Sequence, residues 1–372
     1  MDLTALKETV RTTLALNLNC QGECRIALVA DPTPFDRPEP ELPDRAALAK
    51  LFAEEALALG AKPSVILYPP TGTHGIEPPM DAFRAVYPPA FCEYADRHAL
   101  WEALLAKNLD TAARAELVKI LRGVEPRFDA LLGLTKYSFS HTQFRQMLCE
   151  SGIRAATMPR VELTMFTGVM RADWPEVARR SIAVAEALSR ATAARIRSGG
   201  GRLLTFSLGG RSGMADTGIL ARPGAFGNLP GGEAFIAPVE GTASGSVCVG
   251  PGSNPEAGVF IFEHGRMVEI EGDVPRRAVL DDIFARHPEA RNLAELGVGT
   301  NERAEDPTHI LEAEKILGTV HLAVGDNSTF GGTVRVPFHD DFVVFRPTLI
   351  LVDAEGNEQM ILEDGRLIVG TE

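Results

Sequence analysis

The second half of the chain contains two histidines and three acids whose types and surroundings suit metal binding: Glu233, Glu295, His321, His339 and Asp341. Two of them, His339 and Asp341, stand two residues apart in an extended run, and residues with this spacing share one face of a strand. An imidazole and a carboxylate fixed side by side on a strand are good metal ligands. On its own, an H-x-D pair is more often a surface ion pair than a metal site. The other three residues therefore decide between these two interpretations.

Each of the other three residues interrupts an apolar segment. His321 lies in the run 318–324, and Glu295 lies in the run 293–299. Glu233 opens a further apolar run after a tight turn. A carboxylate is rarely buried unless it is paired or bound to a metal, and an unsatisfied buried polar group costs ~1–3 kcal/mol. A hydrogen-bonded core histidine is the alternative explanation for His321. One metal centre would give all five residues a common positive charge, so we predict a divalent-metal site.

Short apolar runs alternate with helical patterns in the first half of the chain. Residues 25–30, 64–68 and 130–134 are expected as buried strands. In 43–59, apolar residues recur every three and four positions, which predicts a helix. Such alternation is typical of a parallel sheet covered by helices. No G-x-G-x-x-G motif follows the first strand, so the pattern does not indicate a dinucleotide site.

A long helical pattern, from Trp174 to Arg197, ends at the three glycines 199–201, which form the clearest break in the sequence. A chain of 372 residues also exceeds the ~250–300 residues that one core usually serves. We therefore predict an α/β N-terminal domain with a parallel sheet at 1–198. A β-rich α+β C-terminal domain, metal-binding and catalytic, is expected at 199–372.

The predicted C-terminal domain consists mainly of short extended runs separated by glycine and proline. Only 277–286 and a short segment near 308–316 have helical patterns. The runs 348–352, 359–362 and 366–369 are joined by turn residues, which predicts a meander of antiparallel strands.

The net charge of −13 comes entirely from the second half of the chain. Residues 1–198 hold 24 Lys and Arg against 24 Asp and Glu, whereas 199–372 hold 13 against 26, with Lys315 as the only lysine. Such an acidic surface repels nucleic-acid phosphates and anionic lipids, so we expect no nucleic-acid and no membrane partner. The charge alone is also typical of a surface that only confers solubility.

Cysteine usage and the N-terminal segment indicate a cytoplasmic protein. No apolar run approaches the ~20 residues that span a bilayer, and the charges near the N-terminus have helical spacing, which argues against a signal peptide. Five scattered cysteines favour reduced thiols over a disulfide framework. Cys20 and Cys24 form a C-x3-C pair without a second pair, and we interpret them as two buried apolar residues.

Four motifs surround the candidate ligands: G-N-L-P-G-G-E at 227–233, L-A-E-L-G-V-G at 293–299, G-T-V-H-L-A-V-G-D at 318–326 and H-D-D at 339–341. Together they resemble the aminopeptidase T family of metallopeptidases, also called the thermophilic metalloprotease family. The resemblance covers most of residues 130–345. It implies an N-terminal α/β domain, a C-terminal domain with two divalent ions, and a homodimer that encloses its active sites in a cavity. Carried over by motif, the metal ligands are Glu233, Glu295, His321, His339 and Asp341.

The same resemblance implies a reaction. It indicates a divalent-metal-dependent hydrolase of an amide or peptide bond, similar to an aminopeptidase, that uses a metal-activated water on a small-molecule or short peptide substrate. One or two ions of zinc, cobalt or manganese suit the mixed nitrogen and oxygen ligands. Glu233 and Glu295 are then candidate catalytic carboxylates as well as ligands. Asp326 and Ser328, in the loop after His321, are the other candidate catalytic residues.

Ser328 marks a departure from the family. The peptidases carry a catalytic tyrosine seven residues after the histidine that corresponds to His321, and serine stands there in this chain. Losing one donor to an oxyanion costs ~10²–10³ in rate, so the serine argues against efficient peptidase activity.

Two alternatives remain open. The 2,5-dihydroxypyridine ring-cleaving dioxygenases, which are non-haem iron(II) enzymes, resemble the same family and keep the H-x-D pair. They have a histidine at the position of Glu295 and none at that of His321, so the five-ligand pattern favours two metals and the hydrolase. A binding or scaffold protein on a decayed peptidase fold would explain Ser328 but not the intact ligand set.

Overall fold

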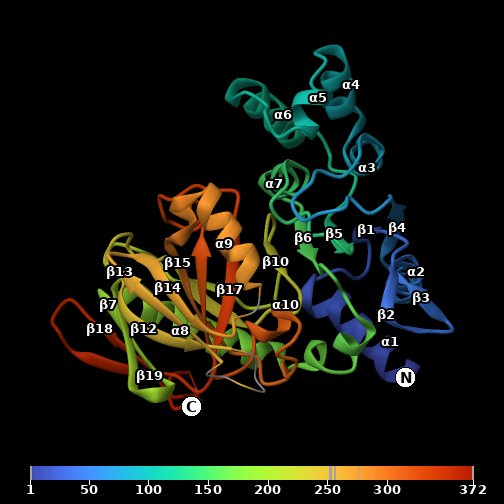
Figure 1. The fold of residues 1–372 in the computed structure, drawn as a ribbon. Helices are drawn as coiled ribbons and strands as arrows, with labels where there is room; N and C mark the ends of the chain where they lie inside the picture. The colour runs from blue at the N-terminus through green and yellow to red at the C-terminus, as the bar shows by residue number, and fades with distance from the viewer. Residues whose placement is uncertain (1, 251–253, 255–256, 275, 371–372) are drawn as a thin grey trace. The chain divides into compact units, whose positions relative to one another are not determined.

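The computed structural model describes residues 2–250, 254, 257–274 and 276–370. It divides the chain into two units (Figure 1). Unit 1 comprises Met1–Arg171 and Gly218–Pro230, and unit 2 comprises Ala172–Thr217 and Gly231–Glu372. Unit 1 is an α/β unit and unit 2 is rich in β-strands, so the predicted fold class is confirmed.

Unit 1 contains a five-stranded sheet in the order β10-β6-β5-β1-β4, in which every pairing is parallel. Its strands are β1 (Arg25–Ala30), β4 (Lys62–Leu67), β5 (Ala130–Leu134), β6 (Arg154–Thr157) and β10 (Phe226–Asn228). A separate ribbon pairs β2 (Pro34–Glu39) with β3 (Leu42–Asp44). The predicted parallel sheet is confirmed, and its three expected strands correspond to β1, β4 and β5.

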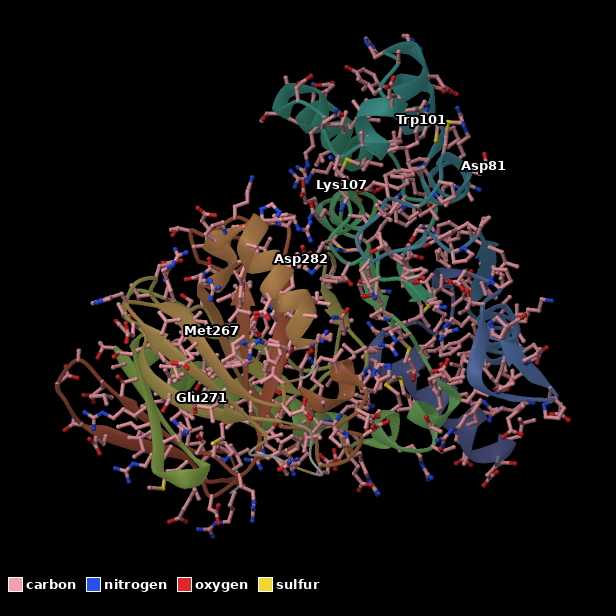
Figure 2. The ribbon with its side chains drawn as sticks, in the orientation of Figure 1. Asp81, Trp101, Lys107, Met267, Glu271 and Asp282 are labelled. Atoms are coloured by element: carbon pink, nitrogen blue, oxygen red, sulfur yellow. A yellow bond between two sulfur atoms is a disulfide. The ribbon has the colours of Figure 1, made fainter. Side chains whose placement is uncertain are left out.

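The helices of unit 1 are α1 (Leu3–Thr12), α2 (Arg45–Ala58), α3 (Met80–Val86), α4 (Pro89–Arg97), α5 (Trp101–Leu105), α6 (Thr111–Gly123) and α7 (Gln143–Glu150), with a π-helical turn η1 (Thr13–Asn17) and 3-10 turns η2 (Leu163–Phe166) and η3 (Val169–Arg171). The helix expected at 43–59 is α2, which begins where the Asp44 side chain accepts a hydrogen bond from the backbone N–H of Ala47. Aromatic rings join α3 to α5. Trp101 (Figure 2) packs edge-on against Phe83, with 5.8 Å between ring centroids.

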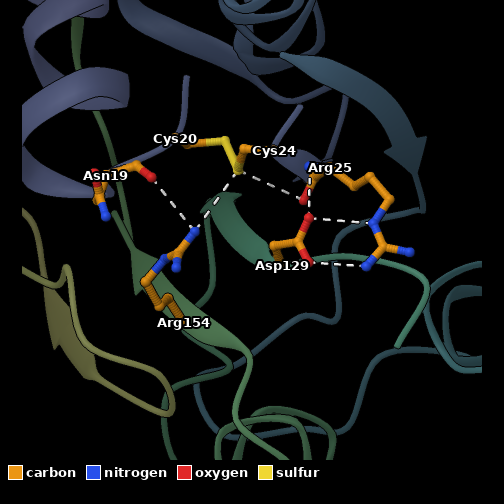
Figure 3. The surroundings of a disulfide bond; sticks show 6 residues. All are labelled: Asn19, Cys20, Cys24, Arg25, Asp129 and Arg154. Carbon is orange, nitrogen blue, oxygen red and sulfur yellow. Dashed lines mark hydrogen bonds and ion pairs between the residues drawn. A yellow bond between two sulfur atoms is a disulfide. The ribbon is translucent and has the colours of Figure 1, made fainter. Parts of the chain in front are cut away.

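Cys20 and Cys24 form a disulfide, so the interpretation of two unlinked thiols is wrong (Figure 3). Between η1 and β1 the chain turns back and brings the two Cα atoms within 5.4 Å, a separation that a disulfide spans readily. Cysteine spacing alone could not reveal this turn. Next to the disulfide, the Arg25 side chain donates two hydrogen bonds, of 2.8 and 3.1 Å, to the carboxylate of Asp129.

Unit 2 consists of two antiparallel sheets. An eight-stranded sheet has the order β14-β13-β12-β8-β7-β18-β19-β20, and a five-stranded sheet has the order β17-β16-β15-β11-β9. The strands of the larger sheet are β7 (Ala193–Ser198), β8 (Arg202–Ser207), β12 (Ser244–Val249), β13 (Gly258–Glu263), β14 (Arg266–Gly272), β18 (Thr348–Val352), β19 (Glu358–Glu363) and β20 (Arg366–Leu367). Those of the smaller sheet are β9 (Met214–Asp216), β11 (Glu233–Ile236), β15 (Leu293–Gly299), β16 (Val320–Gly325) and β17 (His339–Val344). The helices are α8 (Trp174–Arg190), α9 (Arg277–Arg286) and α10 (Ile310–Ala313), with 3-10 turns η4 (Gly199–Gly201) and η5 (Pro288–Arg291).

Unit 2 begins earlier than the break expected at 198/199. The helix expected at 174–197 ends early because residues 193–198 form β7, in which buried Ala194 and Ile196 alternate with more exposed neighbours. Strand β7 pairs with β8 and with β18, and the glycine triplet forms the turn of the β7-β8 hairpin. The glycines therefore lie inside one sheet and do not separate two domains.

The other expectations for unit 2 hold in outline. Helix α9 has the predicted bounds, and α10 is shorter than the segment expected near 308–316. Strands β18, β19 and β20 pair in sequence as the predicted antiparallel meander. Among the described helices of both units, none has the length and apolar character that a membrane crossing requires.

One hydrophobic core lies between the two sheets of unit 2. Alternate residues of β16 and of β13 contribute to it: Val320, Leu322, Val324, Phe260 and Phe262. Met267 of β14 belongs to the same core, whereas Glu271, farther along β14, is exposed and accepts a hydrogen bond from Arg202 (Figure 2). Because side chains alternate along a strand, the five-stranded sheet turns its second face away from this core.

Candidate metal centre

Five acid and histidine side chains share the second face of the five-stranded sheet: Glu233, Glu295, His321, His339 and Asp341. The strand register explains this. Glu295 of β15 and Asp341 of β17 both stand opposite Ala323 of β16, the strand between them. His321 lies two residues from Ala323 and therefore on the same face. The structure thus brings together all five residues that the sequence predicted as metal ligands.

A bare stretch of β15 leaves room for the ligands. Gly297 lies directly opposite His321, and a Cβ atom at position 297 would lie 1.9 Å from His321 Nε2. Gly299 pairs with Glu233 of the neighbouring strand β11, and a Cβ atom there would lie 2.1 Å from the backbone oxygen of Ile316. The imidazole of His321 therefore lies across a glycine backbone, where any side chain would displace it.

Acids and bases alternate through the centre. At the buried end, Lys315 Nζ lies 3.0 Å from Glu314 Oε2 and 2.8 Å from Glu233 Oε1. In the middle, His321 Nε2 lies 3.2 Å from Glu233 Oε2 and 3.4 Å from Glu295 Oε1. At the exposed end, His339 Nε2 lies 3.4 Å from Glu295 Oε2 and 3.6 Å from Asp341 Oδ2. Glu295 therefore directs one oxygen toward each histidine.

The alternating charges shift the pKa values of the buried groups. Burial alone would raise the pKa of Glu295, but hydrogen bonds from His321 and His339 outweigh burial and lower this pKa to about 2. Burial alone would lower the pKa of His321, but the carboxylates of Glu295 and Glu233 raise it to about 9. For His339 burial is again outweighed, and Asp341 and Glu295 raise the pKa well above its ordinary value. The surroundings therefore favour positive charge at the position of both imidazoles.

The centre fits a divalent metal ion. Glu295 Oε2 and Asp341 Oδ2 lie 3.4 and 3.6 Å from His339 Nε2, and the buried Glu233 Oε2 lies 3.2 Å from His321 Nε2. Two ligand atoms that each lie ~2.1 Å from a common ion stand ~3.0–3.4 Å apart, close to the separations within this centre. His339 also donates its Nδ1–H to the backbone oxygen of Asp326 at 2.8 Å. This bond leaves Nε2 facing the acids, as is usual for a metal-binding histidine.

The ligands form two overlapping groups of three. The buried group consists of Glu233, Glu295 and His321, and the more exposed group consists of Glu295, His339 and Asp341; within each group the donor atoms lie within 4.8 Å of one another. The side chain of His339 is 31% exposed, whereas that of His321 is 1% exposed. The group that contains His339 is therefore the side that a substrate can reach.

Lys315 and Glu314 were not predicted as part of the centre. Lys315 follows α10, is 1% exposed, and holds its ammonium between Glu233 and Glu314. Burial lowers the pKa of Lys315, but the surrounding carboxylates raise it well above its ordinary value, so the side chain is a fixed positive charge. The available signal in the sequence was its isolation as the only lysine after residue 198, beside an acid and just before an apolar strand.

The loop between β16 and β17 holds Asp326 and Ser328, whose side chains bond to each other. The Ser328 hydroxyl donates to Asp326 Oδ1 at 2.9 Å, and the backbone N–H of Val336 donates to Asp326 Oδ2 at 3.0 Å. Asp326 thus contacts the candidate ligand His339 through its backbone oxygen, while its carboxylate shapes the loop. The structure does not bring these two candidate catalytic side chains into the group of five ligands.

An aromatic wall borders the exposed group of ligands. Phe235 lies two residues from Glu233 on the same face of β11, and its ring packs edge-on against Phe330 at 5.7 Å between centroids. The Phe330 ring in turn lies edge-on to the His339 imidazole at 5.9 Å. The centre therefore combines charged ligands with an apolar, aromatic side.

Sequence comparison links the chain to one described family. The family model "NicX: 2,5-dihydroxypyridine 5,6-dioxygenase" matches residues 134–369, a segment that includes all five candidate ligands. A comparison with curated proteins finds no match.

Two solved structures share the fold. The 2,5-dihydroxypyridine dioxygenase of Pseudomonas putida KT2440 has a TM-score of 0.68 and 17% sequence identity, over 98% of this chain and 96% of that one. AmpT, the aminopeptidase T of Thermus thermophilus, has a TM-score of 0.61 and 16% identity, over 98% of this chain and 99% of that one. At such identities the likeness shows the fold alone, so the resemblance to aminopeptidase T is confirmed for the fold and not for the reaction.

Proposed function

The chain belongs to the 2,5-dihydroxypyridine 5,6-dioxygenase family, NicX, and from this membership we propose that it is a metal-dependent dioxygenase that opens a small hydroxylated aromatic ring with iron(II). The observation that carries the proposal is the family match over residues 134–369, which includes every candidate ligand. The sequence motifs favoured a hydrolase over this dioxygenase, and the family match reverses that order.

The ligand types suit iron(II). The exposed group of Glu295, His339 and Asp341 provides one imidazole and two carboxylates, and the imidazole of His321 faces the same Glu295 at 3.4 Å. Imidazole and carboxylate ligands of this kind are compatible with non-haem iron(II). When bound, iron(II) supplies the electrons that make O2 reactive toward an electron-rich ring. Glu295 stands between the two imidazoles, at the position where a histidine is expected in the dioxygenases, and in this chain it would add a second carboxylate to the ligand set.

The surroundings of the exposed ligands suit an aromatic substrate. Phe330 stands beside His339, and aromatic rings pack favourably edge-on or offset against such a side chain. The Asp341 side chain is 17% exposed and lies next to the same histidine, so a carboxylate oxygen that does not bind the ion can accept a hydrogen bond from a ring hydroxyl. A hydroxylated ring would therefore find an apolar wall and a hydrogen-bond acceptor on the same side of the centre.

One feature of the centre favours a second function, a two-metal amide hydrolase. Glu295 directs Oε1 toward His321 and Oε2 toward His339, at 3.4 Å in both cases, which is the orientation of a carboxylate that bridges two ions. Ser328 speaks against this function, because it is much shorter than the tyrosine expected of the peptidases and bonds to Asp326. We therefore rank the hydrolase second.

The two functions can be separated by what the protein consumes. Chelator-treated protein is reconstituted with iron(II) without air, and O2 uptake is followed with 2,5-dihydroxypyridine and a panel of related hydroxylated rings. In parallel, protein loaded with zinc, cobalt or manganese is assayed on aminoacyl amides. We expect O2 uptake coupled to loss of ring absorbance, and none with His339→Ala. Hydrolysis of the amides with no O2 uptake on any ring would instead establish the hydrolase.

A further inference from the structure

Lys315 places a positive charge inside the candidate metal centre. Its ammonium lies 2.8 Å from Glu233 Oε1 and 3.0 Å from Glu314 Oε2, and the residue is 1% exposed. The backbone on either side is also fixed, because the Lys315 N–H donates to Glu312 and the Lys315 carbonyl oxygen accepts from Asn301, both at 2.9 Å. If the ammonium moved to solvent, the buried Glu233 and the partly buried Glu314 would both lose their contact with it.

We propose that Lys315 sets the number of metal ions in the centre: its ammonium takes the place of a second cation at Glu233, so that each chain holds one divalent ion. The ion would be held by the exposed group of Glu295, His339 and Asp341, with the imidazole of His321 beside Glu295. The inference rests on the proposed metal-dependent function, and it concerns how many ions the centre binds and which residue decides it.

The two oxygens of Glu233 explain why a second ion is disfavoured. Oε1 is held by Lys315, which leaves only Oε2, 3.2 Å from His321 Nε2, to face the centre. An ion in the buried group would need that same carboxylate and would lie next to an ammonium. Like charges repel strongly in a buried site, where neither water nor salt screens them well. The exposed group contains no atom of Glu233 and is free of this conflict.

Lys315 also supplies what a second ion would supply to the acids. Glu233 is 8% exposed, and a buried carboxylate needs a positive partner. In a centre with two ions the second ion would be that partner, whereas here the protein provides one of its own. The centre has enough acids for two ions, but Lys315 neutralises part of their charge. The centre is therefore compatible with the single ion of a ring-opening dioxygenase.

Counting bound ions tests the inference directly. Full-length protein is treated with chelator, titrated with manganese(II), freed of excess ion and measured by elemental analysis and electron paramagnetic resonance. Wild type is expected to hold one ion per chain with the spectrum of an isolated ion. Lys315→Met removes the charge at similar length and is expected to hold two ions with a spin-coupled spectrum. Lys315→Arg retains the charge and should hold one, as should the control Lys62→Met, a residue of unit 1 that is 60% exposed.

A second variant covers the case in which Lys315→Met does not fold. If the Lys315 ammonium takes the place of an ion at the Glu233 carboxylate, wild type and Glu233→Gln should both bind one ion per chain. If Glu233 instead binds a second ion, wild type should bind two ions per chain and Glu233→Gln one. The inference is overturned if wild type binds two ions per chain or none. It is also overturned if Lys315→Met folds and binds only one ion per chain. None of these measurements uses a substrate, so a centre that holds one ion but takes up no O2 would refute the dioxygenase and leave the role of Lys315 intact.

Discussion

Gly297 and His321 face each other across β15 and β16, and the imidazole occupies the space that a side chain at position 297 would fill. Glu295 lies two residues away on the same strand, and its Oε1 is 3.4 Å from His321 Nε2, so the space over Gly297 allows these two candidate ligands to meet. The position of His321 therefore depends on the absence of a side chain on the neighbouring strand.

Replacing Gly297 with alanine should displace His321 and weaken metal binding. A Cβ atom there would lie 1.9 Å from Nε2, a distance that real structures do not tolerate, so the ring must rotate away from Glu295. We expect the metal affinity to fall by about 10–100-fold, as when the supports of a ligand are removed. Titration with manganese(II) measures the change. Gly123→Ala, at a position with no atom within 4 Å of the added Cβ, is the matched control and should bind as wild type does.

Replacing Asp326 with alanine should affect both stability and the metal. The carboxylate accepts bonds from the N–H and hydroxyl of Ser328 and from the N–H of Val336, and hydrogen bonds to a charged group contribute ~1.5–3 kcal/mol each. The loop that orients His339 would loosen, so we expect both the free energy of unfolding and the metal affinity to fall. Asp353 accepts comparable bonds from the N–H groups of Glu355 and Asn357 in the β18-β19 turn.

Asp353→Ala is therefore the control, because it should lower stability and leave the metal affinity unchanged. Denaturant unfolding and metal titration of the two variants separate these effects. Equal metal affinities in both variants would show that the Asp326 loop does not support His339.

The disulfide between Cys20 and Cys24 should contribute modestly to stability. The cross-link closes a loop of only a few residues, and the loop-entropy relation gives ~2 kcal/mol at this length. We expect reductant to lower the free energy of unfolding of wild type by up to that amount. The free energy of unfolding of Cys20→Ser, which cannot form the bond, should not change with reductant. Thiol titration of the denatured, unreduced protein should find the three free cysteines, Cys92, Cys149 and Cys248. Five reactive thiols would show that the bond does not form.

Asp129 should stabilise the protein in a pH-dependent manner (Figure 3). The hydrogen bonds from Arg25 lower the pKa of Asp129 in the folded state, so its contribution is fully present above the pKa of the unfolded state, ~3.9. As the pH falls through the lower, folded-state pKa, that contribution is lost. The pair is about one-third exposed, so we expect only ~0.2–1 kcal/mol. The free energies of unfolding of wild type and Asp129→Asn should differ at pH 7 and converge as the pH falls through the lowered, folded-state pKa of Asp129.

The spacing of residues along the chain predicted which segments of the centre are strands. It did not predict which strands lie next to one another. The two-residue spacing of His339 and Asp341 and the acid inside 293–299 were sufficient to propose both strands and all five ligands. Which strands pair, and in what register, depends on packing across the whole unit. For that reason the contact between Lys315 and Glu233, 82 positions apart in the chain, was missed although both residues are visible in the sequence.

The fold was mispredicted where two patterns compete. The alanine-rich segment after Trp174 continues a helical spacing into residues 193–198, and pairing with β8 and β18 makes those residues a strand instead. The disulfide was missed because a tight turn, and not the cysteine spacing, brings the two residues together. The homodimer and the cytoplasmic location stay predictions.

Strand β10 has a consequence for how the protein can be divided. The chain enters unit 2 at Ala172, returns at Gly218 to add β10 beside β6, and leaves again after Pro230. A fragment that stops at Arg171 would lack this strand and would leave one edge of β6 with unpaired backbone groups, which invites aggregation. A fragment that starts at Ala172 would carry β10 without the sheet that pairs with it. Each unit is thus built from two separate stretches of the chain. Cutting the chain at one point therefore cannot yield either unit complete, whether for expression alone or for exchange with another protein.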